Sequence, residues 1–370
     1  MAIYDTEEKV TGTIGAIRYV EGGITANIPL AYMVEKGVTV KLFGKKAQVL
    51  SYLGTATGLS VGRYALRATA VGNYALFGGG YMDGGQSAVV DAYDKELTRS
   101  VPTALSVARH TLAATTVGNY ALFGGGRAGS SSSAVVDAYD SELTRSIPTA
   151  LSVVRYNLAA TTVGNYALFG GGYPSSGYSA VVDAYDSELT RSIPTALSVA
   201  RYNLAATTVG NYALFGGGSG SSGYSNVVDA YDSELTRSIP ATLSVTRRMS
   251  AATTVGGYAL FGGSGNSASK VVEAYDKKLT LSIPTALSVA RYNLAAASVG
   301  EYALFGGGRG AANSSAVVDA YDEELTQSIP TVLSDARNNL AATTVGNYAL
   351  FGGGSGSDSY STVVDVYKVA

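Results

Sequence analysis

Short apolar runs and turn-forming residues alternate along this chain in a fixed order. An apolar run at 112–117 (LAATTV) is followed by Gly118-Asn119 and then by a second run that starts at Tyr120 (YALFGG). Because a Gly-Asn pair tolerates positive φ, this pattern predicts two strands joined by a two-residue hairpin turn. The first strand consists mostly of small residues, as expected where strands crowd around a common axis.

Two more strands are predicted further along the same stretch. After a loop rich in glycine and serine, the run 134–139 (AVVDAY) places Val135, Asp137 and Tyr139 on one face of a strand. A short turn then leads to a fourth strand at 143–147. Pro148 ends that strand, because proline has no N–H to donate to a neighbouring strand. The stretch therefore predicts four successive strands, which we call A, B, C and D.

This four-strand pattern recurs seven times. The phrase VGNYALFGGG, or a close variant, returns after steps of 46, 46, 46, 46, 44 and 46 residues. Its copies begin at Val71, Val117, Val163, Val209, Val255, Val299 and Val345. A period of this length built from strands predicts the blades of a β-propeller. Seven of the eight phenylalanines occupy the repeated position of Phe123, where we expect them to fill the space between blades.

One copy of strand D is missing from this count. The phrase LTRSIPTALSVAR and its variants occur six times, and the seventh unit has only strands A to C before Ala370. The segment 51–63 aligns with 97–109 at a 46-residue offset. We therefore expect the segment before the first unit to supply the missing strand and close the ring, leaving no open sheet edge. An open superhelix of blades is the alternative.

Three features of each unit carry a resemblance to a known family. They are Phe123-Gly124-Gly125, the pair Tyr139-Asp140, and Arg155 after strand D, and they recur in the same order along the repeat, with Tyr367-Lys368 in place of the Tyr-Asp pair in the seventh unit. Over roughly 50–370 the chain resembles the kelch-repeat β-propellers. Those repeats usually carry a tryptophan after the Tyr-Asp pair, and this chain has none. The departure suggests a divergent bacterial or phage-like branch, and the resemblance implies a fold but no single function.

The amino-acid composition argues against several classes of function. The net charge is −2, with 26 basic and 28 acidic residues, so we expect no binding to nucleic acid. The chain has no cysteine and one histidine, His110, which leaves no residues for a thiolate metal site or for the copper-radical chemistry of related oxidases. We therefore expect no metal, no cofactor and no enzymatic activity. No secretion signal and no membrane-inserting segment is expected either.

The loops between strands B and C differ from unit to unit, whereas the A–B turns are nearly constant. Both the B–C and D–A loops should emerge on one rim of the propeller. The variable loops use tyrosine, serine, glycine and asparagine, as antibody combining sites do, which suggests a binding rim. Unselected variation in tolerated loops is the alternative. The candidate binding residues are Tyr81, Arg127, Tyr173, Tyr178, Tyr224, Arg309 and Tyr360.

An arginine follows strand D in every unit, and we expect it on the same rim. The seven copies are Arg63, Arg109, Arg155, Arg201, Arg247, Arg291 and Arg337. One interpretation is an anion-binding ring at the mouth of the channel. The other, favoured because every blade repeats it, is a structural pair with a blade carboxylate such as Asp137 or with loop carbonyls.

Residues 1–49 lie outside the repeat, and 50–370 form the propeller. The first segment has short strand-like runs and a modest basic cluster, and it is small for an independent domain. It is either a structural cap or an arm that attaches the propeller to an assembly. Together with a variable rim, an attachment arm suggests a display protein on a phage-like particle, either a receptor binder or a capsid or tail decoration.

The partners expected on this hypothesis are virion or assembly proteins at 1–49 and a cell-surface glycan or protein at the rim. The state of oligomerisation stays open. An intracellular protein-binding scaffold, cytoplasmic in location, is the first alternative. A propeller enzyme that acts on glycans is the second, although its arginines and tyrosines would have to form one unique constellation and here they repeat in every unit.

Overall fold

The computed structural model describes residues 48–265, 268–356 and 359–370, together with the backbone of four strands nearer the N-terminus. The chain divides into two compact units, Met1–Val49 and Leu50–Ala370. In the first unit, β1 (Arg18–Glu21) pairs with β2 (Ile24–Asn27), and β3 (Ala31–Glu35) pairs with β4 (Val38–Phe43). Both pairs are antiparallel hairpins.

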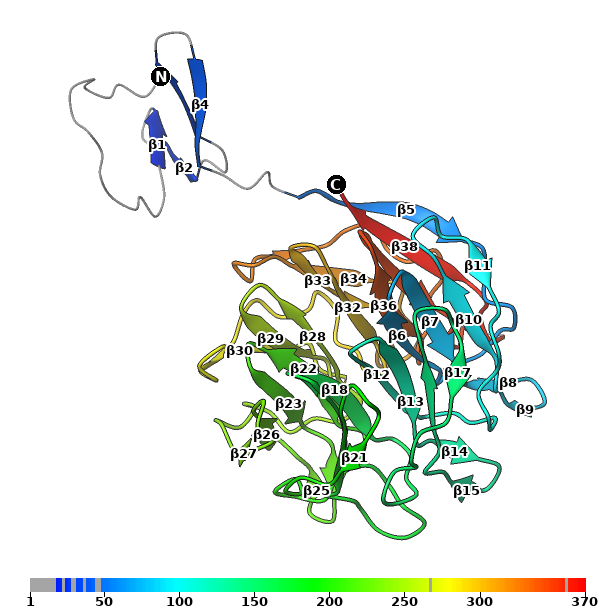
Figure 1. Ribbon diagram of the computed structural model, residues 1–370. Helices are drawn as coiled ribbons and strands as arrows, with labels where there is room; N and C mark the ends of the chain where they lie inside the picture. Colours follow the sequence, from blue (N-terminus) through cyan, green and yellow to red (C-terminus); the bar gives the residue numbers. More distant parts are fainter. Residues whose placement is uncertain are drawn as a thin grey trace. The chain divides into compact units, whose positions relative to one another are not determined.

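The second unit is a seven-bladed β-propeller (Figure 1). Each blade is an antiparallel four-stranded sheet, and the part of the chain that the structure describes contains seven of them. Blade 1 consists of β6 (Arg67–Val71), β7 (Tyr74–Gly78), β10 (Val90–Tyr93) and β11 (Arg99–Ser100). Blade 2 consists of β12 (Ala113–Val117), β13 (Tyr120–Gly124), β16 (Val136–Tyr139) and β17 (Arg145–Ser146). Blade 3 consists of β18 (Ala159–Val163), β19 (Tyr166–Gly170), β20 (Val182–Tyr185) and β21 (Arg191–Ser192).

Blades 4 to 7 follow the same order. They are β22 (Ala205–Val209), β23 (Tyr212–Gly216), β26 (Val228–Tyr231), β27 (Arg237–Ser238); β28 (Ala251–Val255), β29 (Tyr258–Gly262), β30 (Val272–Asp276), β31 (Leu281–Ser282); β32 (Ala295–Val299), β33 (Tyr302–Gly306), β34 (Val318–Tyr321), β35 (Gln327–Ser328); and β36 (Ala341–Val345), β37 (Tyr348–Gly352), β38 (Val364–Val369), β5 (Leu50–Ala56). The predicted fold class is confirmed.

The ring closes as the 46-residue offset predicted. Strand β5, from before the first blade, pairs with β38 as the outer strand of blade 7. The innermost strands of neighbouring blades contact one another all the way round, including β36 with β6. Tyr52 on β5 donates a hydrogen bond to Asp365 on β38 at 2.7 Å, which adds a side-chain link across the closure. Blade 7 thus joins the two ends of this unit, and the propeller has no open end.

Strand D is shorter than the sequence predicted. The expected strand at 143–147 is only β17, two residues long, and the same holds in the other blades built this way. The preceding residues form a tight turn instead. The Asp140 carboxylate accepts hydrogen bonds from the backbone N–H groups of Glu142 and Thr144, and Leu143 has a φ of +62°. An aspartate that satisfies the backbone locally competes with strand pairing, and the prediction missed this.

The hydrophobic core consists of layers between neighbouring blades. One layer joins Val117, Leu122 and Ala138 of blade 2 to Ala167 and Phe169 of blade 3. Each repeated phenylalanine is fully buried against a glycine of the preceding blade. A Cβ at Gly124 would lie 2.6 Å from Cε1 of Phe169, so the flat ring needs a residue without a side chain opposite it. The spacing of blades depends on this pairing.

Replacing Gly124 with alanine should therefore lower the free energy of unfolding by about 1–3 kcal/mol, the usual cost of overpacking a filled core. Equilibrium denaturation measures the change. Gly257→Ala is the matched control, because its Cβ would have 3.6 Å to the nearest atom and should change stability by about 0.5 kcal/mol or less. Phe169→Leu in the Gly124→Ala background should recover part of the loss. Equal effects at Gly124 and Gly257 would refute the packing argument.

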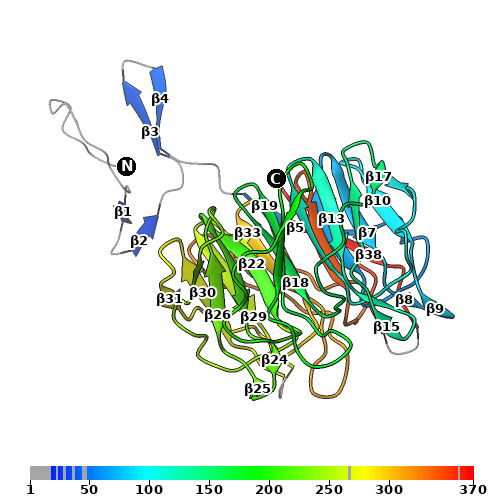
Figure 2. The ribbon, with the colours of Figure 1, turned by 60° about the horizontal axis from the view of Figure 1, so that its bottom comes forward.

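The B–C loops and the D–A loops emerge on the same face of the propeller. In six of the seven blades, the described residue after the buried arginine forms a backbone bridge to the first residue of a B–C loop, as between His110 and Arg127 and between Tyr156 and Tyr173. Among the described residues, three B–C loops contain small hairpins: β8–β9 (Tyr81–Met82, Gly85–Gln86), β14–β15 (Arg127–Ala128, Ser131–Ser132) and β24–β25 (Ser219–Gly220, Gly223–Tyr224). Figure 2 shows β8, β9, β15, β24 and β25 along its lower edge. We call this side the loop face.

Candidate functional site

Four consecutive residues before each inner strand build the loop face. In blade 3 they are Arg155, Tyr156, Asn157 and Leu158. Arg155 is buried in the blade, Tyr156 bridges to the B–C loop, Asn157 lies at the channel mouth, and Leu158 packs in the core layer. One short segment therefore anchors the blade, carries a loop-face side chain and lines the channel.

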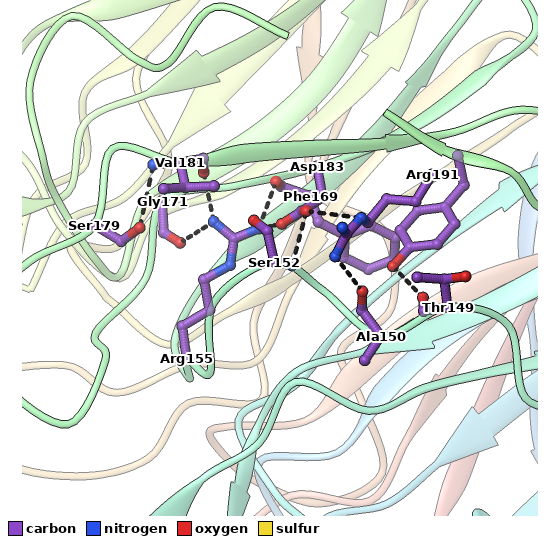
Figure 3. A network of polar contacts seen from close by, with 11 residues as sticks. Thr149, Ala150, Ser152, Arg155, Phe169, Gly171, Ser179, Val181, Asp183 and Arg191 are labelled. Atoms are coloured by element: carbon purple, nitrogen blue, oxygen red, sulfur yellow. Dashed lines mark hydrogen bonds and ion pairs between the residues drawn. The ribbon is translucent and has the colours of Figure 1, made fainter. Parts of the chain in front are cut away.

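The arginine is part of a buried polar network that joins two blades (Figure 3). Nη2 of Arg155 lies 2.5 Å from Oδ2 of Asp183, and it also donates to the carbonyl of Phe169 at 3.1 Å. Both partners belong to blade 3. The Arg155 backbone N–H, by contrast, donates to the carbonyl of Ser133 in the B–C loop of blade 2. The connecting segment is thus held by both blades.

Other side chains of blade 3 hold the same connection. The second oxygen of Asp183 accepts a hydrogen bond from the backbone N–H of Ser152 at 2.9 Å. Tyr185 donates to the carbonyl of Thr149 at 2.7 Å, and Arg191 donates to that of Ala150 at 2.7 Å (Figure 3). Burial lowers the pKa of Arg155 to about 10, while Asp183 opposes the shift, so the guanidinium stays charged at neutral pH. The network makes a rigid base for the loop face.

The same pair occurs in all seven blades. Each arginine and its carboxylate partner are 0% exposed. The pairs are Arg63–Asp91, Arg109–Asp137, Arg155–Asp183, Arg201–Asp229, Arg247–Glu273, Arg291–Asp319 and Arg337–Asp365. Of the two roles left open by the sequence, the geometry is that of pairing with a blade carboxylate. The arginines line neither the channel nor its mouth, which corrects their expected place on an exposed rim.

A closed ring of backbone hydrogen bonds surrounds the channel mouth. One residue per blade takes part, and each N–H donates to the carbonyl of its counterpart in the preceding blade at 2.9–3.0 Å. The ring consists of Ala65, Thr111, Asn157, Asn203, Met249, Asn293 and Asn339. All seven have φ between +50° and +53°, a left-handed conformation that asparagine tolerates better than most residues. The ring therefore links all seven blades through their backbones at the mouth.

The mouth opens into a cavity of about 480 Å³ on the axis. This size is within the range of small-molecule sites, about 300–1,000 Å³. Its walls are the ring residues and the alanines at the start of the inner strands, with Arg67, His110 and Tyr64 added on one side. Further along the channel is a second cavity of about 340 Å³, lined by alanine, threonine and serine. In that part, hydroxyls of neighbouring blades bond to each other, as Thr115 does to Thr162 at 2.9 Å.

An aromatic cluster stands beside the mouth where blades 7, 1 and 2 meet. The ring of Tyr64 lies 4.8 Å from that of Tyr360 and 5.7 Å from that of Tyr81, and Tyr81 lies 5.4 Å from His110. Burial raises the pKa of Tyr64. Burial, then Arg127 and Arg67, lowers the pKa of His110, which is therefore neutral at pH 7. The cluster joins two predicted residues, Tyr81 and Tyr360, to the cavity.

A second aromatic cluster lies over blades 3 and 4. Tyr173 is 5.6 Å from Tyr156, 5.5 Å from Tyr202 and 5.6 Å from Tyr178. Tyr178 and Tyr202 are stacked, with 20° between their planes. Tyr178 is still 37% exposed. Such contacts contribute about 0.5–1.5 kcal/mol each, so they hold the rings in place while leaving an edge and a face open to a ligand.

The remaining predicted residues lie around these clusters. The guanidinium of Arg127 lies 5.8 Å from the Tyr156 ring. Tyr224 lies under Arg248, whose guanidinium is 4.7 Å from its ring centre. Arg309 is exposed, and its backbone bridges to Tyr292. The structure therefore places all seven predicted loop residues on the loop face, most of them in contact with a residue from a D–A loop.

Sequence reasoning missed several members of this site. Tyr64, Arg248 and Arg67 were not predicted as site residues. Tyr64 and Arg248 stand directly after a buried arginine, so the position in the repeat could have identified them. Arg67 begins strand β6, and the six other blades have alanine at this position. The signal that could have identified Arg67 in the sequence was its departure from the alanine of the other blades.

The described residues contain neither a metal-binding cluster nor a membrane-spanning helix. No group of three or more histidine, cysteine, aspartate or glutamate side chains is arranged to hold a metal ion in the described part of the chain. Among the same residues, no helix is long and apolar enough to cross a membrane.

Comparisons with known proteins bear on the fold. No family model matches the chain, and no curated protein matches it. The solved structure of YjhT is similar, with a TM-score of 0.60 over 75% of this chain and 99% of that one. The two sequences are 10% identical, so this likeness supports the propeller fold alone.

Proposed function

We propose that this chain is a non-enzymatic binding protein that recognises a ligand with its loop face, and that its propeller is a divergent member of the kelch type. One observation carries the proposal. Aromatic side chains from the B–C and D–A loops gather in two clusters on the loop face, one of them beside the cavity, on a scaffold in which every blade repeats the same buried network. A constant scaffold with a varied, tyrosine-rich face is the arrangement that antibody combining sites use.

The ligand that fits the clusters best is a glycan. Stacked and edge-on tyrosines offer flat apolar faces for the C–H side of a sugar ring, while their hydroxyls and the nearby serines and asparagines accept and donate hydrogen bonds. Tyr178 is the exposed residue of the second cluster, and Tyr173 contacts its ring as well as those of Tyr156 and Tyr202. We expect them to contribute most to binding.

The unit Met1–Val49 would attach the propeller to a larger assembly, for which a phage-like particle is the candidate. Mass spectrometry of purified particles released by the source strain, with antibody labelling for position, tests this. The chain should be present at stoichiometric copy number on a tail or capsid, and should be lost from particles when residues 1–47 are deleted. Recovery only from the cell-soluble fraction would instead favour the intracellular scaffold.

Binding by the loop face is tested separately with a glycan array. Tyr178→Ala and Tyr173→Ala should each weaken binding about five- to thirty-fold, because each removes a stacking surface of about 1–2 kcal/mol. Tyr178→Phe should retain most binding, since the ring remains. Glu188→Ala, on the C–D turn of the same blade, is the control and should bind as the unaltered protein does. Unchanged binding in both tyrosine-to-alanine variants would rule out the second cluster as the site.

A further inference from the structure

The channel mouth contains one charged side chain that the repeat does not explain. Arg67 begins β6, and its side chain lines the cavity of about 480 Å³ on the axis. The six other blades have Ala113, Ala159, Ala205, Ala251, Ala295 and Ala341 at this place. The fold therefore accepts alanine here, and the arginine in blade 1 serves no packing role that the other blades need.

The guanidinium of Arg67 also differs from those of the seven buried arginines in its partners. Nη1 donates to the carbonyl of the neighbouring residue Leu66 at 2.9 Å. No carboxylate among the described residues lies within ion-pair distance of it. Burial alone lowers the pKa of Arg67 to about 10, with no neighbouring negative charge to oppose the shift. Arg67 is partly exposed, and a cation that loses part of its hydration without gaining a counter-ion is unfavourable unless something else neutralises it.

The walls of the cavity would not neutralise it either. The residues lining this cavity include no aspartate or glutamate, and the other basic group among them is His110. The remaining polar groups are uncharged: the amides of Asn157, Asn203, Asn293 and Asn339, and hydroxyls of threonine, serine and tyrosine. The field inside the cavity is therefore positive, and it is surrounded by hydrogen-bond donors.

We infer that the channel mouth is a binding site for the oxyanion group of a small organic ligand, with Arg67 as the residue that pairs with the anion. A guanidinium presents parallel N–H groups that match the two oxygens of a carboxylate and also fit sulfate or phosphate. The volume has room for more than an ion, and the alanine walls suit the apolar part of the molecule. The inference goes beyond the proposed function, because it needs no ligand on the aromatic clusters.

Equilibrium dialysis with radiolabelled acetate, sulfate and phosphate, each alone and at constant low ionic strength, tests the site. We expect one equivalent bound per chain, and an affinity about ten-fold or more weaker in Arg67→Ala, since one charge-assisted hydrogen-bonded pair is lost. The ranking of the anions decides between a carboxylate and a tetrahedral oxyanion. Arg67→Ala should fold normally, because it makes blade 1 like the others.

Two control variants make the result specific. Arg309→Ala removes an exposed charge from the same face and should leave anion binding unchanged. Tyr178→Ala should also bind the anions normally, so failure of the glycan proposal would leave this result intact. Absence of saturable binding for all three anions, or equal binding by the original protein and Arg67→Ala, would overturn the assignment.

Discussion

Replacing Asp183 with alanine should lower the free energy of unfolding by about 3–5 kcal/mol, the usual result of removing one member of a buried ion pair. Arg155 would keep its charge but lose its partner at 2.5 Å, with both side chains 0% exposed. The backbone N–H of Ser152 would lose its acceptor as well. Equilibrium urea denaturation monitored by far-UV circular dichroism measures the change.

Two further variants separate the ion pair from other effects of the substitution. Ser176→Ala, on the exposed B–C loop of the same blade, should change stability by about 0.5 kcal/mol or less. The double variant Arg155→Met with Asp183→Leu should be more stable than Asp183→Ala alone, because no charge is then left buried without a partner. If Asp183→Ala were as stable as the control, the network would not be what holds the connection between blades.

Deleting residues 1–57 should destabilise the propeller strongly, whereas deleting residues 1–47 should not. The longer deletion removes β5, and with it the antiparallel pairing from Val364↔Ala56 to Val369↔Leu50 and the bond of Tyr52 to Asp365. Several hydrogen bonds at about 1 kcal/mol each are lost together with the apolar cover of β38. We expect Tm to fall by about 10 °C or more.

The longer deletion should also cause association between molecules, because β38 becomes an open sheet edge that can pair with another chain. Differential scanning calorimetry and size-exclusion chromatography follow the two effects. Adding a synthetic peptide of residues 48–57 in trans should restore part of the Tm if the missing strand is the cause. Equal stability of the two deletion variants would show that ring closure by β5 contributes little.

The buried arginines show where reading the sequence reached its limit. Arg155 and Asp183 are 28 residues apart, and in the sequence Arg155 looks like any loop arginine beside a tyrosine. The burial of Arg155 depends on how the segment between two blades folds over the next blade, and no local sequence pattern predicts this. The sequence favoured a structural pair because every blade repeats the arginine, and the packing of strands B and C against the connection shows that its partner is a blade carboxylate.

The length of strand D and the role of Arg67 also could not be predicted from the repeat pattern alone. Asp140 delays the start of strand D by accepting hydrogen bonds from the backbone N–H groups of Glu142 and Thr144. Arg67 differs from its six alanine counterparts in the sequence, but its charge indicates a site only because the ring places it in a cavity at the channel mouth that has no carboxylate in its walls. Arg67 is a candidate binding residue because of the cavity walls that surround it.

By itself, the sequence determined that this protein is an all-β propeller of seven blades closed by a strand from before the first blade. Strand alternation, two-residue turns and the repeat period are properties of neighbouring residues, and closure followed from counting copies of strand D. The tertiary structure alone decided that the arginine ring is buried, that loop tyrosines gather in two clusters, and that Arg67 faces the channel. These features depend on contacts between blades and across the closed ring, such as that of Ala65 with Asn339, which form only when all seven blades are in place.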